Sequence, residues 1–223
     1  MQSPTNERVI LITGASRGIG AEVAQQLAGA GTHVIVNYRD TVERAEAIVD
    51  AVRSAGGSAS TLAADISDEA DVIAMMDHIA DRYGRLDAVV LNASETGTDP
   101  SSAMRVNHDA QGRLARLATP LMPVDGRIVF VTSHQAHFFP NKAVPKGYST
   151  IVASQRAGET ALYGMRSEFD RAAVRFTVVS GDMIDGTTPS VSQFATAITD
   201  AVTASDPSSI VYVRGADYLM TAA

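Results

Sequence analysis

Short apolar runs alternate with longer amphipathic stretches along the chain. Valine and isoleucine are common in the short runs, as expected of strands buried on both faces. The predicted strands are Arg8–Thr13, His33–Asn37, Ser58–Ala63, Ala88–Leu91, Arg127–Val131, Val174–Val179 and Ile210–Val213. The predicted helices, which carry apolar residues at helical spacing, are Glu22–Ala30, Thr41–Ala55, Ser67–Tyr83, Ser102–Ala118, Tyr148–Phe169 and Val191–Ala204. This alternation predicts an α/β fold with a doubly wound, seven-stranded parallel sheet flanked by helices.

The composition is that of a globular enzyme-sized chain. No repeat or low-complexity linker interrupts the 223 residues, so we expect residues 1–223 to form a single domain. The absence of cysteine excludes a disulfide scaffold, a thiolate nucleophile and any cysteine-ligated metal. A net charge of −7 argues against nucleic acid as a partner. No apolar run approaches the roughly 20 residues that span a bilayer, and the polar Met1–Arg8 segment is no secretion signal, so we expect a soluble cytoplasmic protein without a membrane partner.

A glycine-rich turn joins the first predicted strand to the first helix. It reads TGASRGIG over Thr13–Gly20, with glycines at Gly14, Gly18 and Gly20. The free amides and the dipole of a helix N-terminus favour a phosphate group, and glycine allows the backbone to approach it closely. The turn therefore predicts a site for the phosphates of a dinucleotide.

TGASRGIG resembles the TGxxxGIG signature of the short-chain dehydrogenase/reductase family, and the resemblance extends over nearly the whole chain. It implies a Rossmann fold, a nicotinamide cofactor, and hydride transfer between that cofactor and a carbonyl or alcohol. Leu91-Asn-Ala-Ser94 stands where the family has Asn-Asn-Ala-Gly, and Ser180-Gly181 stands where it has Pro-Gly. The cofactor-binding positions that the resemblance implies are Gly14, Ser16, Arg17, Gly18, Ile19, Gly20, Asp65, Ile66, Asn92, Ala93 and Gly181.

The end of the second strand bears on the choice between the two nicotinamide cofactors. NAD-selective sites place a carboxylate there to bind the ribose 2′-hydroxyl, but this chain has Asn37 at the expected position. Arg17 and Arg39 are placed to bind a 2′-phosphate, for which the planar guanidinium is well suited. Asp40 would supply an acid if the alignment shifted by one residue. The pattern favours NADP(H) over NAD(H).

The catalytic region keeps two of the family's four residues. Ser133, which ends Val-Phe-Val-Thr-Ser, matches the serine that positions the substrate oxygen. Asn107, in Arg-Val-Asn-His, matches the helix asparagine that holds a proton-relay water. The family's Tyr-x-x-x-Lys pair, in which the tyrosine transfers the proton and the lysine binds the nicotinamide ribose, is absent.

Two registers are compatible with the helix that should carry this pair. In the first, Tyr148 is the catalytic tyrosine and the residue four positions later is Val152. In the second, Ala153-Ser-Gln155 resembles the family's Ala-Ser-Lys, which puts Gln155 at the lysine position and Ile151 at the tyrosine position. The distance to the sixth strand favours the second register. Tyr148 then lies about one turn earlier, near the start of the helix.

Several groups could donate the proton. A tyrosine without a nearby lysine has a pKa near 10, so Tyr148 would donate a proton more readily than it would accept one, which favours carbonyl reduction over alcohol oxidation. Lys146 lies two residues before it and could supply a charge. His134 and His137 follow Ser133 and are alternative donors, since the pKa of histidine is nearer neutrality.

Two further regions bear on the substrate and on the assembly. Phe138 and Phe139 lie in the loop after Ser133, which in the family borders the substrate and so hints at an apolar or aromatic carbonyl compound. The connection between Asn92 and Asn107 and the segment after Gly186 are short for the family, which predicts an open cleft. The helices near Asn107 and from Tyr148 onward form subunit interfaces in many members, so we expect a homodimer or homotetramer.

These observations favour an NADPH-dependent ketoreductase that acts on a small organic carbonyl compound. Two alternatives follow from the missing tyrosine–lysine pair. The protein would then bind NADP(H) but be redox-inactive and have a regulatory role, or it would catalyse a non-redox reaction such as isomerisation or elimination. The fold by itself does not separate these functions.

Overall fold

The computed structural model describes residues 7–29, 31–97, 99–144, 146–182 and 191–213. These residues form one parallel sheet with the strand order β3-β2-β1-β4-β5-β6-β7, which is the doubly wound arrangement that the sequence predicts. The strands are β1 (Arg8–Ile12), β2 (Thr32–Tyr38), β3 (Ser58–Ala63), β4 (Ala88–Leu91), β5 (Arg127–Ser133), β6 (Arg175–Gly181) and β7 (Ile210–Val213).

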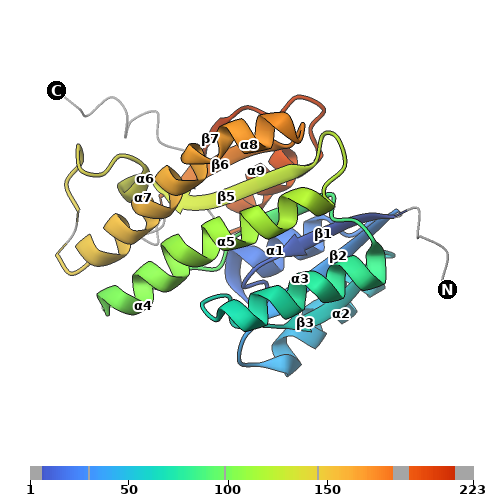
Figure 1. The fold of residues 1–223 in the computed structure, drawn as a ribbon. Helices are drawn as coiled ribbons and strands as arrows, with labels where there is room; N and C mark the ends of the chain where they lie inside the picture. The colour runs from blue at the N-terminus through green and yellow to red at the C-terminus, as the bar shows by residue number, and fades with distance from the viewer. Residues whose placement is uncertain (1–6, 30, 98, 145, 183–190, 214–223) are drawn as a thin grey trace.

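Helices cover both faces of the sheet (Figure 1). The helices α3 (Glu69–Tyr83), α5 (Ala110–Ala118), α7 (Ser149–Gly164) and α8 (Arg166–Arg171) pack on one face. The helices α1 (Gly18–Gln26), α2 (Val42–Ser54) and α9 (Val191–Thr203) pack on the other. Each face has its own apolar core, because successive strand residues point to opposite sides: in β1, Val9 and Leu11 enter one core, and Ile10 and Ile12 enter the other.

Two predicted helices are interrupted. The predicted helix Ser102–Ala118 consists of α4 (Pro100–Met104), a π-helical turn over Arg105–Asp109, and α5, and a short 3-10 turn over Thr119–Leu121 follows. The predicted helix Tyr148–Phe169 is divided into α7 and α8, with a break at Met165. After Ser133 the chain forms a one-turn helix, α6 (His134–His137), where the sequence analysis expected a loop.

Glycine 158 explains why the π-helical turn and α7 lie so close together. A Cβ atom on Gly158 would overlap the carbonyl oxygen of Asn107. A glycine in the middle of a helix is unfavourable by about 1 kcal/mol relative to alanine, so its presence indicates a need for close approach. The close packing brings the side chain of Asn107 within hydrogen-bonding distance of Ser154 on α7.

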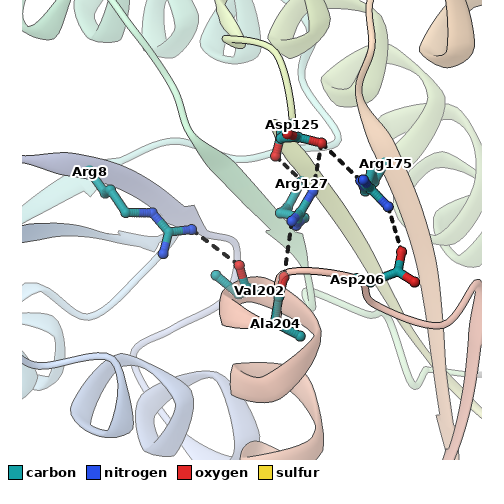
Figure 2. Close-up of polar contacts among 7 residues, drawn as sticks. All are labelled: Arg8, Asp125, Arg127, Arg175, Val202, Ala204 and Asp206. Atoms are coloured by element: carbon teal, nitrogen blue, oxygen red, sulfur yellow. Dashed lines mark hydrogen bonds and ion pairs between the residues drawn. The ribbon is translucent and has the colours of Figure 1, made fainter.

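The edge at which the parallel strands begin, called the amino edge below, is fastened by arginines. Arg8, Arg127 and Arg175 are the first residues of β1, β5 and β6 (Figure 2). Arg8 donates a hydrogen bond to the carbonyl oxygen of Val202 at 3.1 Å, and Arg127 donates one to that of Ala204 at 3.0 Å. Both acceptors lie at the C-terminal end of α9, where helix carbonyl groups have no intrahelical partner and cations are favourable.

Two aspartates complete this network. Asp125 Oδ1 accepts a hydrogen bond from Nε of Arg175 at 2.9 Å, and Asp206 accepts one from Nη1 of the same arginine at 2.7 Å. Arg127 donates to the main-chain oxygen of Asp125 at 2.8 Å and is almost fully buried. Burial, with Arg175 nearby, lowers the pKa of Arg127.

Candidate functional site

The three glycines of the first turn do different things. Gly14 has φ +63°, and a Cβ atom there would lie 3.0 Å from the Cα of Ala93. A Cβ atom on Gly20 would lie 2.6 Å from Nδ2 of Asn92. Gly18 has φ +60° and faces open space, with no neighbouring atom within 4 Å of its Cβ position. Gly14 and Gly20 thus close the turn against the end of β4, and Gly18 leaves its outer side free for a ligand.

The turn leads directly into the N-terminus of α1. The helix begins at Gly18, and the Arg17 side chain at the N-cap position makes no capping hydrogen bond. Arg17 and Gly18 are exposed, and Ser16 and Ile19 are partly exposed. The first-turn amides of α1 are therefore available to an anion, as the sequence predicts for a phosphate group.

Asn37 fixes this turn, a role that the sequence analysis missed. Its Oδ1 accepts from the amide of Gly14 at 3.2 Å, and its Nδ2 donates to the carbonyl oxygens of Leu62 and Ala64, each at 3.2 Å. The side chain is almost fully buried. Asn37 therefore connects the ends of three strands and does not face a ribose. Any selection between NAD(H) and NADP(H) would depend on the exposed residues that follow it.

Arg39 is the first of these exposed residues. Its Nε donates to both carboxylate oxygens of Asp40, at 3.1 and 3.0 Å, and this hydrogen bond raises the pKa of Arg39. Both side chains are more than half exposed. The two Nη groups of Arg39 remain to bind an anion, although the carboxylate of Asp40 competes for the same cation.

The other expected cofactor positions lie along the edge where the strands end, called the carboxyl edge below. Asp65 follows β3, and its Oδ1 accepts from both the amide and the hydroxyl of Ser67, at 2.9 and 2.8 Å. Ile66 beside it is buried. Gly181 ends β6, and a Cβ atom there would overlap the ring of Phe194.

Ser133 is part of a polar chain that runs from β5 to the π-helical turn. Its Oγ accepts a hydrogen bond from the amide of Ala136 at 3.1 Å and donates to Oε1 of Gln155 at 3.2 Å. Nε2 of Gln155 donates to Oγ of Ser94 at 3.0 Å, and Ser94 donates to Oδ1 of Asn107 at 3.1 Å. Ser133, Gln155 and Asn107 are buried, and Ser94 is exposed.

All four hydrogen-bonding positions of the Asn107 amide are occupied by protein groups. Oδ1 accepts from Ser94 and from the amide of Glu95 at 2.9 Å. Nδ2 donates to the carbonyl oxygen of Glu95 at 3.0 Å and to Oγ of Ser154 at 2.9 Å. A relay water would have to displace one of these partners.

The structure places the candidate proton donors in different environments. Tyr148 immediately precedes α7 at its N-cap and is 42% exposed, and its hydroxyl makes no hydrogen bond within the described part of the chain. His134 is 1% exposed, with Nδ1 at 2.8 Å from Oγ of Ser180. His134 is therefore directed into the protein, whereas the hydroxyl of Tyr148 is accessible.

His137 belongs to a second polar cluster that the sequence analysis did not identify. Its Nδ1 lies 2.8 Å from Oε1 of Glu159, and its Nε2 lies 3.0 Å from the hydroxyl of Tyr212. Arg156 also contacts this oxygen of Glu159, at 3.0 Å, and Glu159 is completely buried. Burial and the carboxylate of Glu159 raise the pKa of Tyr212. Glu159 lies four residues after Gln155, on the same face of α7. This spacing was the only signal in the sequence that could have identified Glu159.

Among the described residues, no group of three or more histidine, aspartate or glutamate side chains could hold a metal ion. Within those same ranges, no helix is long and apolar enough to cross a membrane.

Comparison with known proteins identifies the chain's relatives. The family model described as short chain dehydrogenase matches residues 8–197. The chain belongs to this family. The matched span includes the glycine turn, Ser133 and Gln155.

Curated relatives of this short-chain dehydrogenase include reductases. It is 35% identical over 162 residues to a probable tetrahydroxynaphthalene reductase of Zymoseptoria tritici, an alignment that covers 69% of this chain and 59% of the relative. It is 34% identical over 195 residues to 1-cyclohexenylcarbonyl-CoA reductase of Streptomyces collinus, covering 82% of this chain and 67% of the relative. The chain thus spans less than two thirds of the length of the first of these relatives.

Solved structures show the same architecture. A metagenomic short-chain oxidoreductase in complex with NADP superimposes with a TM-score of 0.82 at 26% identity, covering 95% of this chain and 99% of that one. The predicted fold of this short-chain dehydrogenase is therefore confirmed.

Proposed function

We propose that this short-chain dehydrogenase is an NADPH-dependent ketoreductase that reduces a carbonyl group of a small organic molecule. The observation that carries the proposal is the pairing of two features at the carboxyl edge. One is the glycine turn, closed at Gly14 and Gly20 and open at Gly18. The other is the buried Ser133–Gln155 contact at the end of β5. The relatives named as reductases support this function.

The residues of the carboxyl edge fit NADP(H), which supplies the hydride when bound. Gly18 and the first turn of α1 would hold the phosphates. Arg17 and Arg39 would bind the 2′-phosphate, and both are exposed. The further positions proposed for the cofactor are Gly14, Ser16, Ile19, Gly20, Asp65, Ile66, Asn92, Ala93 and Gly181. The NADP complex of the metagenomic neighbour supports this choice.

Gln155 is proposed to replace the lysine of the Tyr-x-x-x-Lys pattern. Its contact with Ser133 supports the register that places it at the lysine position. Only one of its two amide protons is used in the contact with Ser94, so the other remains to hold a ribose hydroxyl. Ser133 would position the substrate, Asn107 would hold Ser94 and the loop before α4 in place, and Tyr148 would donate the proton from its accessible hydroxyl. His134 is the second candidate donor.

Absorbance of NADPH provides the test. Consumption of NADPH with carbonyl compounds is expected, and Tyr148→Phe should lower the rate about a hundredfold, the scale of a lost general acid. Tyr163→Phe is the matched control, because Tyr163 lies on α7 against Phe176 and away from Ser133. Tight NADPH binding with no turnover across a panel of aldehydes and ketones would refute the function. An unchanged rate in Tyr148→Phe would move the donor role to His134.

One observation favours a second candidate function. Gln155 is uncharged and contacts Ser133 and Ser94, so no cation lies beside Ser133 among the contacts described above. A protein that binds NADP(H) without redox turnover, or that catalyses an isomerisation or elimination, agrees with that neutral site. Product analysis after incubation with the same panel distinguishes it from a reductase.

We also propose that the face formed by α5 and α7 is a subunit interface in a homodimer or homotetramer. A hollow of about 480 Å³ lies elsewhere, on α2 and α3, but one of about 420 Å³ lies on this face. The residues that line it include His108 of the π-helical turn, Arg113 of α5 and Ala161 of α7. Nη1 of Arg113 is buried and has no hydrogen-bond partner within the described residues. Light scattering should give two or four times 23.4 kDa. A monomer would refute the interface.

A further inference from the structure

The backbone of Glu95 determines where the protons lie in the polar chain that ends at Ser133. An amide N–H can only donate and a carbonyl oxygen can only accept. The amide of Glu95 contacts one end of the Asn107 side chain at 2.9 Å, and the carbonyl oxygen of Glu95 contacts the other at 3.0 Å. The oxygen of the Asn107 side chain must therefore face the Glu95 amide, and only one orientation of this side chain satisfies both groups.

Each following hydrogen bond inherits its direction from this one. Because Oδ1 of Asn107 is an acceptor, Ser94 must donate its proton to it. Ser94 Oγ then accepts from its other partner, so the nitrogen of the Gln155 amide faces Ser94. The oxygen of that amide is left to face Ser133, and Ser133 must donate to it. A neutral amide thereby transmits the polarity of a main-chain group to the serine.

Ser133 consequently has no further proton to donate to a substrate. Its only proton is directed at Gln155, and one of its two lone pairs accepts from the amide of Ala136 at 3.1 Å. One lone pair remains. A ketone oxygen placed against it would bring two acceptors together, whereas a hydroxyl group would satisfy it.

We propose that Ser133 accepts a hydrogen bond from a hydroxyl group of the substrate, and that the protein selects hydroxylated carbonyl compounds, such as hydroxyaryl ketones, over unhydroxylated ones. Ser94 is the positioning residue, because it connects Asn107 to Gln155 and fixes the polarity. The inference rests on the proposed reductase function. A site built to pair with a hydroxyl discriminates strongly against an analogue without it, because a buried polar group is then left unpaired.

The chemistry balances without a further reagent. The carbonyl carbon gains the hydride as NADPH is oxidised to NADP⁺, and the carbonyl oxygen gains a proton from the general acid. The second hydroxyl, which binds Ser133, keeps its proton and is unchanged in the product. That group serves recognition alone, so binding and turnover both report on it.

Hydroxytetralones and their methyl ethers provide the matched probes, with the substituent at each position of the aromatic ring in turn. Methylation removes the donor and keeps the oxygen. For at least one position, the complex of the wild-type protein with NADP⁺ should bind the hydroxyl compound at least tenfold more tightly than its ether in calorimetry. The ratio of kcat/KM should follow with NADPH.

Variants of the polar chain then test the polarity itself. In Ser94→Ala, the Gln155 amide loses the partner that orients it and is free to turn its nitrogen towards Ser133, so the preference should fall below about threefold. Ser94→Thr keeps the hydroxyl and should restore the preference. Gln155→Glu presents only acceptors to Ser133, so the preference should persist although the bond to Ser94 is lost. Melting temperature and NADPH fluorescence confirm that each variant folds.

The outcomes separate the two proposals. If the wild-type protein reduces no carbonyl compound, the reductase function fails. If it reduces ketones but treats every hydroxyl compound and its ether alike, only the substrate inference fails. A tenfold preference that survives in Ser94→Ala would refute the role of Ser94, and a preference lost in Gln155→Glu would refute the acceptor role of Ser133.

Discussion

The two edges of the sheet are held by different kinds of polar contact. At the amino edge, Arg127 and Arg175 contact Asp125 through charged groups (Figure 2). At the carboxyl edge, Ser133 and Gln155 are linked by neutral hydroxyl and amide groups. Both edges join strands to helices through polar contacts. The comparison teaches that charged groups fasten the sheet to α9, whereas neutral groups set the direction of the hydrogen bonds at the proposed substrate site.

The direction of hydrogen bonds is the physical reason why the two edges use different groups. A guanidinium carries only donors, so the direction of each of its hydrogen bonds is fixed by the arginine itself. An amide or hydroxyl carries both donor and acceptor sites, so a connected chain of them admits a single arrangement once one end is fixed. That fixed arrangement is useful beside a substrate and unnecessary at the far edge of the sheet.

The largest expected effect is at the amino edge. Arg127→Met removes two hydrogen bonds from a buried cation to the main-chain oxygens of Asp125 and Ala204. At about 1.5–3 kcal/mol for each such bond, the free energy of unfolding should fall by about 4 kcal/mol in urea titration. The affinity for NADPH should not change when it is measured under conditions where the variant is fully folded. Arg175→Met is the control: this side chain is exposed, so the loss should be much smaller, and equal losses would contradict the role of burial.

A second effect at the amino edge concerns acid. His33, the second residue of β2, is buried between Ser58, Ser60 and Tyr83, and burial, with Arg82 and Arg53 nearby, lowers its pKa from 6.5 to about 4. The unfolded chain therefore binds a proton at a higher pH than the folded chain does. The stabilisation is complete above pH 6.5 and is lost as the pH falls towards 4.

The size of this loss follows from the pKa difference. At about 1.4 kcal/mol per unit, the lowering from 6.5 to about 4 corresponds to about 3 kcal/mol of unfolding free energy. His33→Gln should remove this contribution, so the difference in stability between wild type and variant should shrink between pH 6.5 and pH 4. A difference that is the same at both pH values would show that His33 is not the responsible group.

The fold was predictable because its signals are local. Runs such as Ala88–Leu91 are apolar throughout, and the glycines at 14 and 18 mark a turn that needs positive φ. The same is true of Ser133, which ends a strand. These features follow from the immediate sequence, and the structure confirms the order of strands and helices that they predict.

The polar chain and the second cluster were not predictable, since they join distant segments. His137 meets Glu159 across 22 positions and Tyr212 across 75. The direction of the bonds at Ser133 depends on the backbone of Glu95, in a loop whose path no pattern specifies. One overlooked signal was Gly158, because a glycine within a helix indicates close approach.

The smallest expected effect lies at the carboxyl edge and leaves folding unchanged. Arg39 is exposed, and within the described residues its ion pair is with its neighbour Asp40, so Arg39→Ala should not alter the melting temperature measurably. If Arg39 binds the 2′-phosphate, the variant should bind NADPH about tenfold more weakly, with little change for NADH, when the two are compared by fluorescence titration.

Asp40→Asn sharpens this last test, because it removes the carboxylate that competes for Arg39. NADPH should then bind more tightly while NADH is unaffected. If Arg39→Ala weakens both cofactors equally, the guanidinium does not recognise the phosphate. In that case the preference for NADP(H) would have to rest on Arg17. If Asp40→Asn tightens neither, the ion pair does not oppose phosphate binding. Since the Arg39–Asp40 pair is exposed and contributes little to stability, changes in cofactor affinity here can be measured without an accompanying loss of stability.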